Sequence, residues 1–130
     1  MALESELENL NGMLMQSKVE FRQYQAQRDK PVLLQQAGEK LFNCVELYLT
    51  LKYNTRIESY AQAYQLSRNE RSDSKLLYDA RELHRFFYNY TEQFPDIREA
   101  VKQFVSVRDR LNVKLRGIGK RYAIRGINEG

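Results

Sequence analysis

The sequence predicts an all-α fold, an up-and-down bundle of four to five helices, and three observations carry that prediction. Apolar residues recur at steps of three and four along most of the 130 residues, which is the spacing of helices that bury one face. Strict alternation of polar and apolar residues, the mark of a half-buried strand, never persists beyond a few residues. The two prolines, Pro31 and Pro95, fall where one helix can end and another begin.

The first two predicted helices are long and amphipathic. Residues 3–24 carry a seam with heptad steps but no strong charge code beside it, which favours a bundle helix over a free coiled coil. Pro31 suits the first turn of the second helix, where its missing N–H costs nothing. Cys44 lies on the inner stripe of this helix and is expected in the core. The seam is Leu3, Leu7, Leu10, Leu14, Ser17, Phe21 and Tyr24, and the second stripe is Leu34, Ala37, Leu41, Cys44, Val45 and Tyr48.

The middle of the chain predicts a short helix and a longer one. The short helix is marked by Ile57, Tyr60, Ala61 and Tyr64, and a polar loop over residues 67–74 follows it. The fourth helix is expected to begin with Asp73 or Ser74 as its N-cap and to stop at Pro95. Its inner stripe is Leu76, Ala80, Leu83, Phe87, Tyr90 and Phe94.

A fifth helix can begin with Asp96 as its cap, and Arg108 interrupts its otherwise apolar stripe. Gly117 and Gly119 are expected to end it, because glycine breaks helical continuity. We therefore predict one helical domain over residues 1–116 and a basic, flexible tail over residues 117–130. The stripe of the fifth helix is Ile97, Val101, Phe104, Arg108, Leu111 and Leu115.

The net charge of +4 is concentrated near the C-terminus. Residues 1–105 carry 14 Lys and Arg against 15 Asp and Glu, whereas residues 106–130 carry 7 against 2. This basic excess can attract phosphate backbones or an acidic partner, and a solvated tail explains it equally well. The seven basic residues are Arg108, Arg110, Lys114, Arg116, Lys120, Arg121 and Arg125.

Residue counts and spacing exclude several kinds of site. One histidine and one cysteine cannot form an intrachain zinc site of the usual composition. Residues 117–121 lack the first glycine and the Ser or Thr of a phosphate-binding loop. No segment approaches the roughly 18 apolar residues of a membrane span, and the acidic N-terminus does not resemble a secretory signal. We therefore expect a cytoplasmic protein without a membrane anchor, a metal or a cofactor.

A polar strip beside the core stripe of the fourth helix is the best candidate site. Arg81, His84 and Tyr88 are spaced i, i+3 and i+7, which places them on one flank of a helix. Histidine suits acid–base chemistry at neutral pH, and the strip can also bind a phosphate or a partner helix. The alternative is architecture, in which His84 bonds to a nearby carbonyl or carboxylate. For Arg108 three interpretations stay open: a buried carboxylate partner, a cleft or dimer seam, or a head group that reaches water over apolar surface.

Two segments together carry a family resemblance. Residues 36–46 combine small residues, a Glu-Lys pair and an aromatic residue, and residues 76–88 contain the pattern Ala-x-x-Leu-His-x-x-Phe-Tyr. With the spacing between them, they resemble the HEPN superfamily (higher eukaryotes and prokaryotes nucleotide-binding), in particular its archaeal Pyrobaculum-repeat branch. The resemblance covers roughly residues 5–116. The pattern is carried by Ala80, Leu83, His84, Phe87 and Tyr88.

This resemblance implies a helical bundle that commonly dimerises. Its catalytic members are metal-independent ribonucleases with an Arg-x(4–6)-His motif assembled across a dimer cleft. Here Arg81 lies only three residues before His84, and Lys114 stands where a motif beginning at Arg108 would need histidine. The family's catalytic motif is therefore not intact in this chain.

Three functional interpretations follow. The leading one is a non-catalytic HEPN-like homodimer that binds RNA, a nucleotide or a protein partner such as a nucleotidyltransferase, in the toxin–antitoxin or defence setting that the resemblance implies. The second is a ribonuclease with a displaced site, with His84 as base and Arg81 or Arg108 stabilising the phosphorane charge. The third is a structural module that dimerises through the seam of residues 3–24 and its aromatic residues. The candidate binding residues are Arg81, His84, Tyr88, Arg108, Lys114, Lys120 and Arg121.

Overall fold

The computed structural model describes the backbone of residues 2–89 and 97–124 and the side chains of residues 5–85 and 97–118. This part of the chain is helical and contains no strand, which confirms the predicted all-α class. Its helices are α1 (Ala2–Ala26), α2 (Pro31–Tyr53), α3 (Tyr60–Ser67), α4 (Arg71–Asn89) and α5 (Ile97–Ile124).

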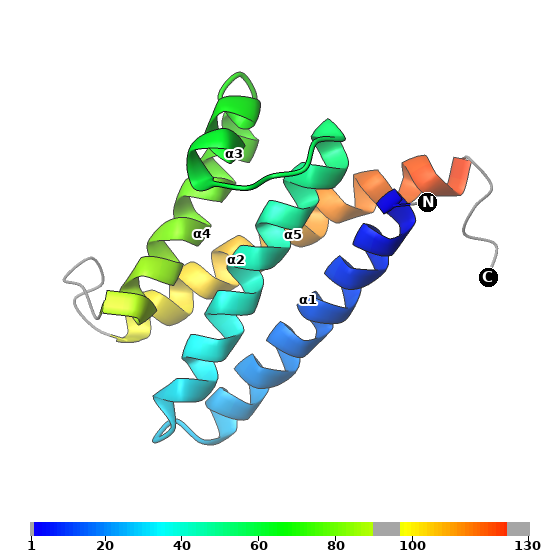
Figure 1. Cartoon of the computed structure of the whole chain (residues 1–130). Coiled ribbons are helices and arrows are strands. Elements are labelled where there is room, and N and C mark those ends of the chain that lie inside the picture. Colours follow the sequence, from blue (N-terminus) through cyan, green and yellow to red (C-terminus); the bar gives the residue numbers. More distant parts are fainter. Residues whose placement is uncertain (1, 90–96, 125–130) are drawn as a thin grey trace.

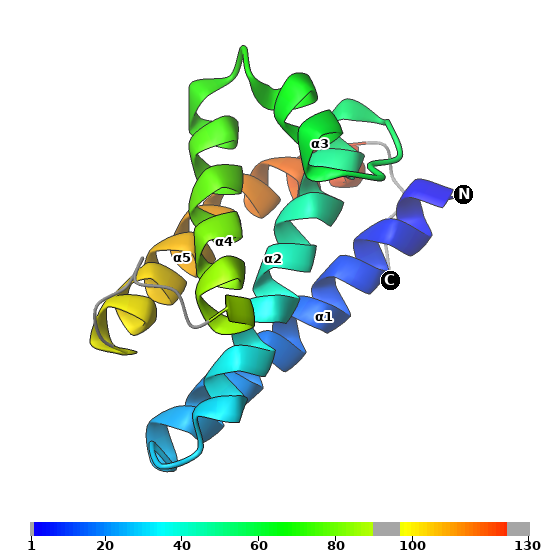
Figure 2. The same cartoon turned by 60° about the vertical axis from the view of Figure 1, so that its left-hand side comes forward.

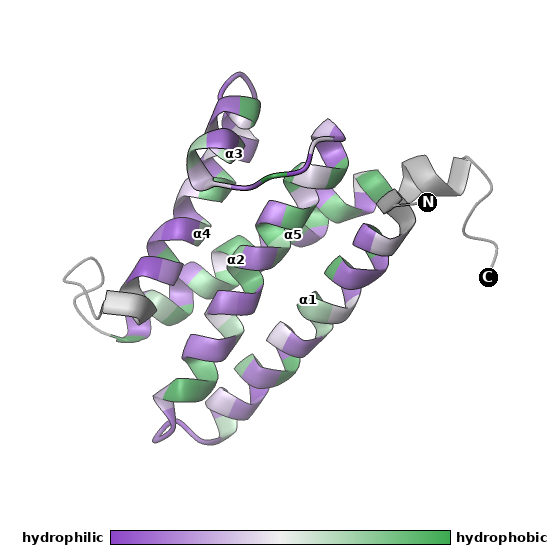
Figure 3. Cartoon of the chain, in the orientation of Figure 1, coloured by the Kyte–Doolittle hydropathy of each residue, from purple (hydrophilic) through white to green (hydrophobic). Residues whose placement is uncertain are grey.

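The four long helices alternate in direction, and the short α3 sits at one end of α2 and α4 (Figures 1 and 2). Helix α2 is central, because it contacts each of the other four helices. Helix α1 forms an antiparallel hairpin with α2 and lies at the edge of the bundle, while α5 runs behind α2 (Figure 1). In Figure 3 apolar and polar residues alternate along α1 and α2, as expected for helices that bury one face.

The seam of α1 is buried in the chain's own core. Leu10, Leu14, Phe21 and Tyr24 are 5% exposed or less, and the ring of Phe21 stacks on Phe104 of α5 with centroids 4.4 Å apart. The hairpin is tight, since Ser17 Oγ donates a hydrogen bond to the carbonyl oxygen of Ala37 on α2 at 2.8 Å. These four residues are therefore buried within a single chain, and dimerisation through the seam stays a prediction.

Helix α2 begins at Pro31, as predicted, and its expected inner stripe is buried. It ends at Asn54, whose φ of 50° lies in the left-handed region and whose N–H donates to the Thr50 carbonyl. Cys44 has no exposed surface and is a free thiol, which confirms its assignment to the core.

The predictions for α3 and for the start of α4 need correction. Helix α3 begins after Ser59, whose side chain accepts from the Gln62 N–H, and it turns the small residues Ala63 and Ser67 inward rather than Tyr64. The predicted loop over residues 67–74 shrinks to residues 68–70, because α4 begins at Arg71. Asp73 is therefore not an N-cap but a fully buried residue in the first turn of α4, held there by side chains from α2 and α5.

Helix α5 is longer than predicted. It continues through Gly117 and Gly119 to Ile124, so these glycines do not end it, and Ile118 between them is buried. A glycine inside a helix costs about 1 kcal/mol, which burial of a neighbouring apolar side chain can offset. The predicted helix stop at Pro95, the cap at Asp96 and the tail beyond residue 124 lie outside the described residues.

Within the described ranges, no helix is both long enough and apolar enough to cross a lipid bilayer.

Candidate functional site: the face of α3 and α4

His84 lies on α4 and packs against α2. Its ring stacks on Phe42, with centroids 4.9 Å apart and an interplanar angle of 15°. Its Nδ1 lies 3.3 Å from Oε1 of Glu39, and the His84 and Glu39 side chains are 30% and 37% exposed. A carboxylate beside one ring nitrogen can orient an imidazole. His84 thus has both an aromatic and an acidic neighbour on α2.

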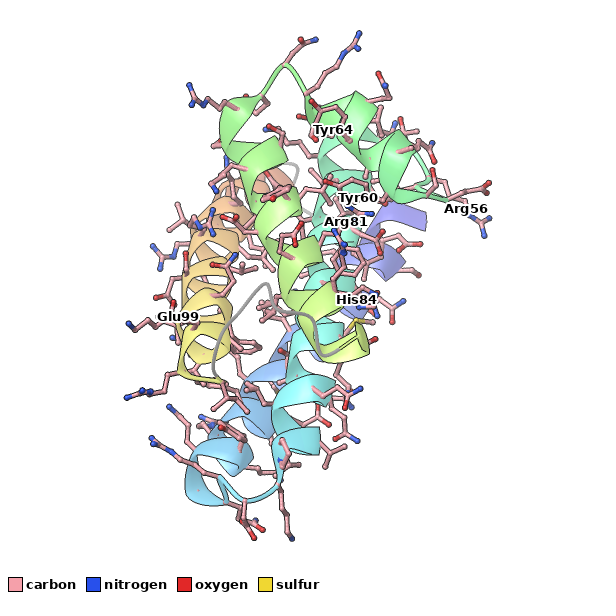
Figure 4. All side chains as sticks on the ribbon, turned by 90° about the vertical axis from the view of Figure 1, so that its left-hand side faces the viewer. Arg56, Tyr60, Tyr64, Arg81, His84 and Glu99 are labelled. Atoms are coloured by element: carbon pink, nitrogen blue, oxygen red, sulfur yellow. The ribbon has the colours of Figure 1, made fainter. Side chains whose placement is uncertain are left out.

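Arg81, one turn earlier on α4, is directed toward α3. Its guanidinium carbon lies 4.2 Å from the centre of the Tyr60 ring, a cation–π contact. Figure 4 shows Tyr64, Tyr60, Arg81 and His84 following one another along one side of the molecule. The structure therefore brings Arg81 and His84 to one surface, where they contact different helices. Tyr88, the third residue of the predicted strip, has its side chain outside the described residues.

Two further tyrosines lie near the Arg81–Tyr60 pair, Tyr64 one turn after Tyr60 on α3 and Tyr78 one turn before Arg81 on α4. Tyr64 and Tyr78 are 46% and 45% exposed, and Tyr60 is half-buried. Burial is the main cause that raises the pKa of Tyr60. Arg81 lowers this pKa, and the charges of Glu82, Tyr78 and Tyr64 raise it.

A lysine completes this surface, because Lys75 Nζ lies 5.6 Å from the centre of the Tyr78 ring. We call Tyr60, Tyr64, Tyr78, Lys75 and Arg81 the tyrosine–arginine face.

The carboxylates of α4 beside this face are buried, whereas Lys75 of the face is exposed and Arg81 is half-buried. Asp79 and Glu82 are 7% and 5% exposed, and Arg68, Arg71 and Lys75 are exposed. Asp79 joins α4 to α5, since its Oδ2 lies 2.7 Å from Nη2 of Arg110 and its Oδ1 lies 3.0 Å from Nζ of Lys75. The surface that solvent meets is therefore richer in cations than the sequence of α3 and α4 indicates.

Glu82 is a buried carboxylate, and its ion pair with Arg85 is loose. Its Oε1 lies 3.6 Å from Nη1 of Arg85, and no described residue donates a hydrogen bond to its Oε2. Its charge contributes to the raised pKa of Tyr60.

A second polar cluster surrounds Asp73 where α2, α4 and α5 meet. Its Oδ1 accepts from Tyr48 Oη at 2.8 Å, and its Oδ2 accepts from Lys52 Nζ at 2.5 Å and from Tyr53 Oη at 3.0 Å. Lys114 Nζ of α5 lies 3.1 Å from Oδ1. Because this buried carboxylate is surrounded by donors from two other helices, the cluster is built to hold the bundle together.

The pKa directions in this cluster follow from that geometry. Burial raises the pKa of Asp73, but hydrogen bonds from Lys52, Tyr48 and Lys114 outweigh it and leave the pKa below its usual value. Burial and the nearby Asp73 raise the pKa of Tyr53 to about 12 and also raise that of Tyr48. Asp73 is thus ionised at neutral pH, while both phenols keep their protons.

Much of the basic C-terminal segment is used within the fold. Arg110 pairs with Asp79 and Lys114 pairs with Asp73, which leaves less of their charge for an external phosphate. Arg108 Nε lies 3.1 Å from the exposed carboxylate of Asp109, and its guanidinium carbon lies 5.7 Å from the centre of the Phe21 ring on α1. Among the interpretations of Arg108, this geometry fits a head group at the surface over apolar side chains. Of the remaining candidates, Lys120 and Arg121 have side chains outside the described residues.

The parts of the displaced ribonuclease site do not meet within one described chain. His84 packs on α2, Arg108 lies over Phe21 of α1, and no contact joins the two among the described side chains. Arg81 shares a helix with His84 but stacks on Tyr60. In that same part of the chain, no three His, Cys, Asp or Glu side chains gather as a metal ion would require.

The tyrosines and Asp73 are the residues that sequence reasoning missed. The pattern of the short helix includes Tyr64, which is exposed, whereas Tyr78 falls between the stripe positions Leu76 and Ala80, a signal that it faces outward. Asp73 carried no such signal, because its donors lie 20 or more residues away in the sequence. Comparison with models of protein families, with curated proteins and with solved structures gives no match to this chain, so its HEPN resemblance stays a prediction.

Proposed function

We propose that this chain is a non-catalytic, HEPN-like RNA-binding domain that takes single-stranded RNA on its tyrosine–arginine face. The observation that carries the proposal is the exposure of Tyr64 and Tyr78 beside outward-facing cations. Proteins that bind single strands without strong sequence preference combine a positively charged path for the backbone with aromatic rings on which bases stack. The proposal includes a cytoplasmic setting, in which such RNA occurs.

Each part of the face has a role in this proposal. Bases stack on the rings of Tyr64 and Tyr78, which leave solvent on contact with RNA. Arg81 contacts phosphates, and the ring of Tyr60 holds its guanidinium in place. Lys75 also reaches phosphates, because its side chain is 63% exposed although it pairs with Asp79. Because Asp79 and Glu82 are buried, they present little acidic surface to an approaching phosphate.

Fluorescence anisotropy with a labelled single-stranded RNA of roughly 12 nucleotides, within the usual range of site sizes, tests the proposal. We expect Tyr64→Ala and Tyr78→Ala each to weaken binding by about 1–3 kcal/mol, which is roughly 5- to 150-fold in Kd. Tyr64→Phe keeps the ring and is expected to bind like the parent chain. Binding of the parent should weaken steeply between about 50 and 200 mM salt, because phosphate contacts release counterions.

A charge control is available on α5. Lys102 is 75% exposed and pairs with Glu99, which Figure 4 places on the opposite side of the molecule from Tyr60. Lys102→Ala should leave binding nearly unchanged, whereas Arg81→Ala should weaken it. The proposal fails if the parent chain does not bind RNA at low salt, or if all tyrosine variants bind as tightly as the parent.

A second candidate, a metal-independent ribonuclease, is favoured by one observation, the placement of Glu39 beside His84 Nδ1. In this candidate His84 acts as general base, Glu39 orients it, and Arg81 stabilises the phosphorane. RNA cleavage that is lost in His84→Ala and reduced in Glu39→Gln, with both variants folded, would support it. Equal cleavage by His84→Ala and the parent chain, or none by either, rules it out.

A further inference from the structure

The outer side of α1 carries a second stripe, opposite the seam that packs on α2 and α5. At 100° per residue, Gly12, Met15 and Val19 point away from Leu10, Leu14 and Phe21. Figures 1 and 2 both show α1 at the edge of the bundle, with no labelled helix over its outer side. The stripe keeps heptad steps of four and three, and we call its six residues the outer stripe: Glu8, Gly12, Met15, Val19, Arg22 and Ala26.

The middle of the outer stripe is apolar and lies beside a surface hollow. Met15 is 68% exposed, the most exposed of the chain's large apolar side chains in the described ranges. Gly12 is exposed, and a Cβ added to it would meet no atom within 4 Å. A surface hollow of about 620 Å³ opens beside them, and it is lined by Gly12, Met15 and Val19 together with the polar side chains of Gln16, Glu20, Gln23 and Lys40. The chain's own packing therefore requires neither a glycine at position 12 nor an exposed methionine at position 15.

The charges of the outer stripe are arranged for a copy of α1 that runs in the opposite direction. Glu8 and Arg22 each lie seven residues from Met15, on opposite sides of it, and both are exposed. An antiparallel copy centred on Met15 brings Glu8 beside Arg22 of the second copy and brings Gly12 beside Val19 of the second copy. A parallel copy would instead oppose Glu8 to Glu8 and Arg22 to Arg22, which is unfavourable.

We propose that two copies of this chain pair through antiparallel contact of their α1 helices, centred on Met15. The contact is isologous, since each residue pair occurs twice about a two-fold axis. Gly12 gives the hole into which Val19 of the second copy packs, and Met15 of each copy fills apolar surface beside the axis. The pairing leaves the inner seam of α1 in its own core and leaves the tyrosine–arginine face of α3 and α4 uncovered by this contact.

Light scattering after gel filtration measures the pairing directly. At roughly 50 µM we expect the parent chain to run at twice the 15.5 kDa mass of one chain. Met15→Glu places two carboxylates beside the axis and should weaken association at least about tenfold. Val113→Glu is the matched control, because Val113 is 60% exposed on α5 and outside the outer stripe. Far-UV circular dichroism checks that each variant is folded.

Single charge-reversal variants test whether the two α1 helices run antiparallel. Glu8→Arg and Arg22→Glu should each associate more weakly than the parent, because each opposes like charges twice. A mixture of the two variants should form mixed dimers, since one variant is basic at both of these positions and the other is acidic at both.

A monomeric parent chain overturns the proposal, and so does a dimer that Met15→Glu leaves unchanged. If the mixture does not restore association, the antiparallel arrangement is wrong. These results do not depend on RNA binding, which is measured with variants of α3 and α4.

Discussion

Asp73 is a carboxylate without exposed surface that receives hydrogen bonds from α2 and an ion pair from α5. Burying a charge is costly unless donors replace the lost water, and here two phenols and two ammonium groups do so. The lowered pKa of Asp73 shows that these donors outweigh burial. The stabilisation that this cluster gives to the fold therefore depends on the charge of Asp73.

Removing that charge should destabilise the fold. Asp73→Asn leaves Lys52 and Lys114 without their counterion, and we expect the free energy of unfolding to fall by about 2–3 kcal/mol. Urea denaturation measures the loss. Asp109→Asn is the matched control, because the Asp109 side chain is 60% exposed and its pair with Arg108 should contribute at most about 0.5 kcal/mol. A loss below about 1 kcal/mol in Asp73→Asn would contradict the role given to this cluster.

Asp73 should also make the stability of the fold depend on pH. Because folding lowers the pKa of Asp73, its contribution is fully present above the ordinary value of 3.8 and disappears as the pH falls through that value toward the folded pKa. The stability difference between the parent chain and Asp73→Asn should therefore stay constant between about pH 7 and 5 and shrink below about pH 4. Urea denaturation at several pH values tests this. A difference that grows at low pH would mean that the pKa is raised instead.

At the scale of elements, each correction arises where a long-range contact outweighs a local signal. Ser and Asp near position 73 are typical of an N-cap, yet α4 begins earlier because Asp73 is drawn between α2 and α5. Helix α3 packs through Ala63 and Ser67, which lets it lie close to α4 and leaves Tyr64 outside. The glycines of α5 stay helical while Ile118 is buried.

Because α5 is helical at Gly117, an alanine at this position should raise the thermal stability of the chain. A Cβ at Gly117 meets nothing within 4 Å, so Gly117→Ala gains helix propensity without a clash. We expect Tm to rise by up to about 4 °C, corresponding to roughly 1 kcal/mol. Differential scanning calorimetry measures the change, and Gly117→Pro should lower Tm strongly. An unchanged Tm in both variants would indicate that α5 ends before position 117.

At the scale of the whole molecule, α2 is surrounded by the other helices, and Cys44 lies on its buried side. Burial raises the pKa of the Cys44 thiol to about 12, with a smaller opposing influence from Lys18. A thiol without exposed surface and with so high a pKa reacts only when the bundle opens.

Alkylation of Cys44 should therefore report global opening. At pH 8 we expect iodoacetamide to label the native chain far more slowly than the chain unfolded in urea, because the native thiol is both buried and protonated. Mass spectrometry follows the labelling. Asp73→Asn should accelerate native labelling by about tenfold for each 1.4 kcal/mol of lost stability, and Asp109→Asn should not. Rapid labelling of the native parent chain would contradict the buried position of Cys44.

The sequence by itself determined the all-α class, the two long N-terminal helices, the start of α2 at Pro31 and the burial of Cys44. These features follow from periodicity and from local chemistry, which a single segment carries. Only the tertiary structure decided the course of α5 past Gly117, the outward direction of Tyr64 and the burial of Asp73 among donors from α2 and α5. Each of these three features depends on contacts with residues that are distant in the sequence, and a local sequence pattern does not predict such contacts. The outer stripe of α1 depends on both the sequence and the tertiary structure. Its heptad steps can be found in the sequence, but its exposure follows only from the burial of the inner seam on the opposite side of the helix.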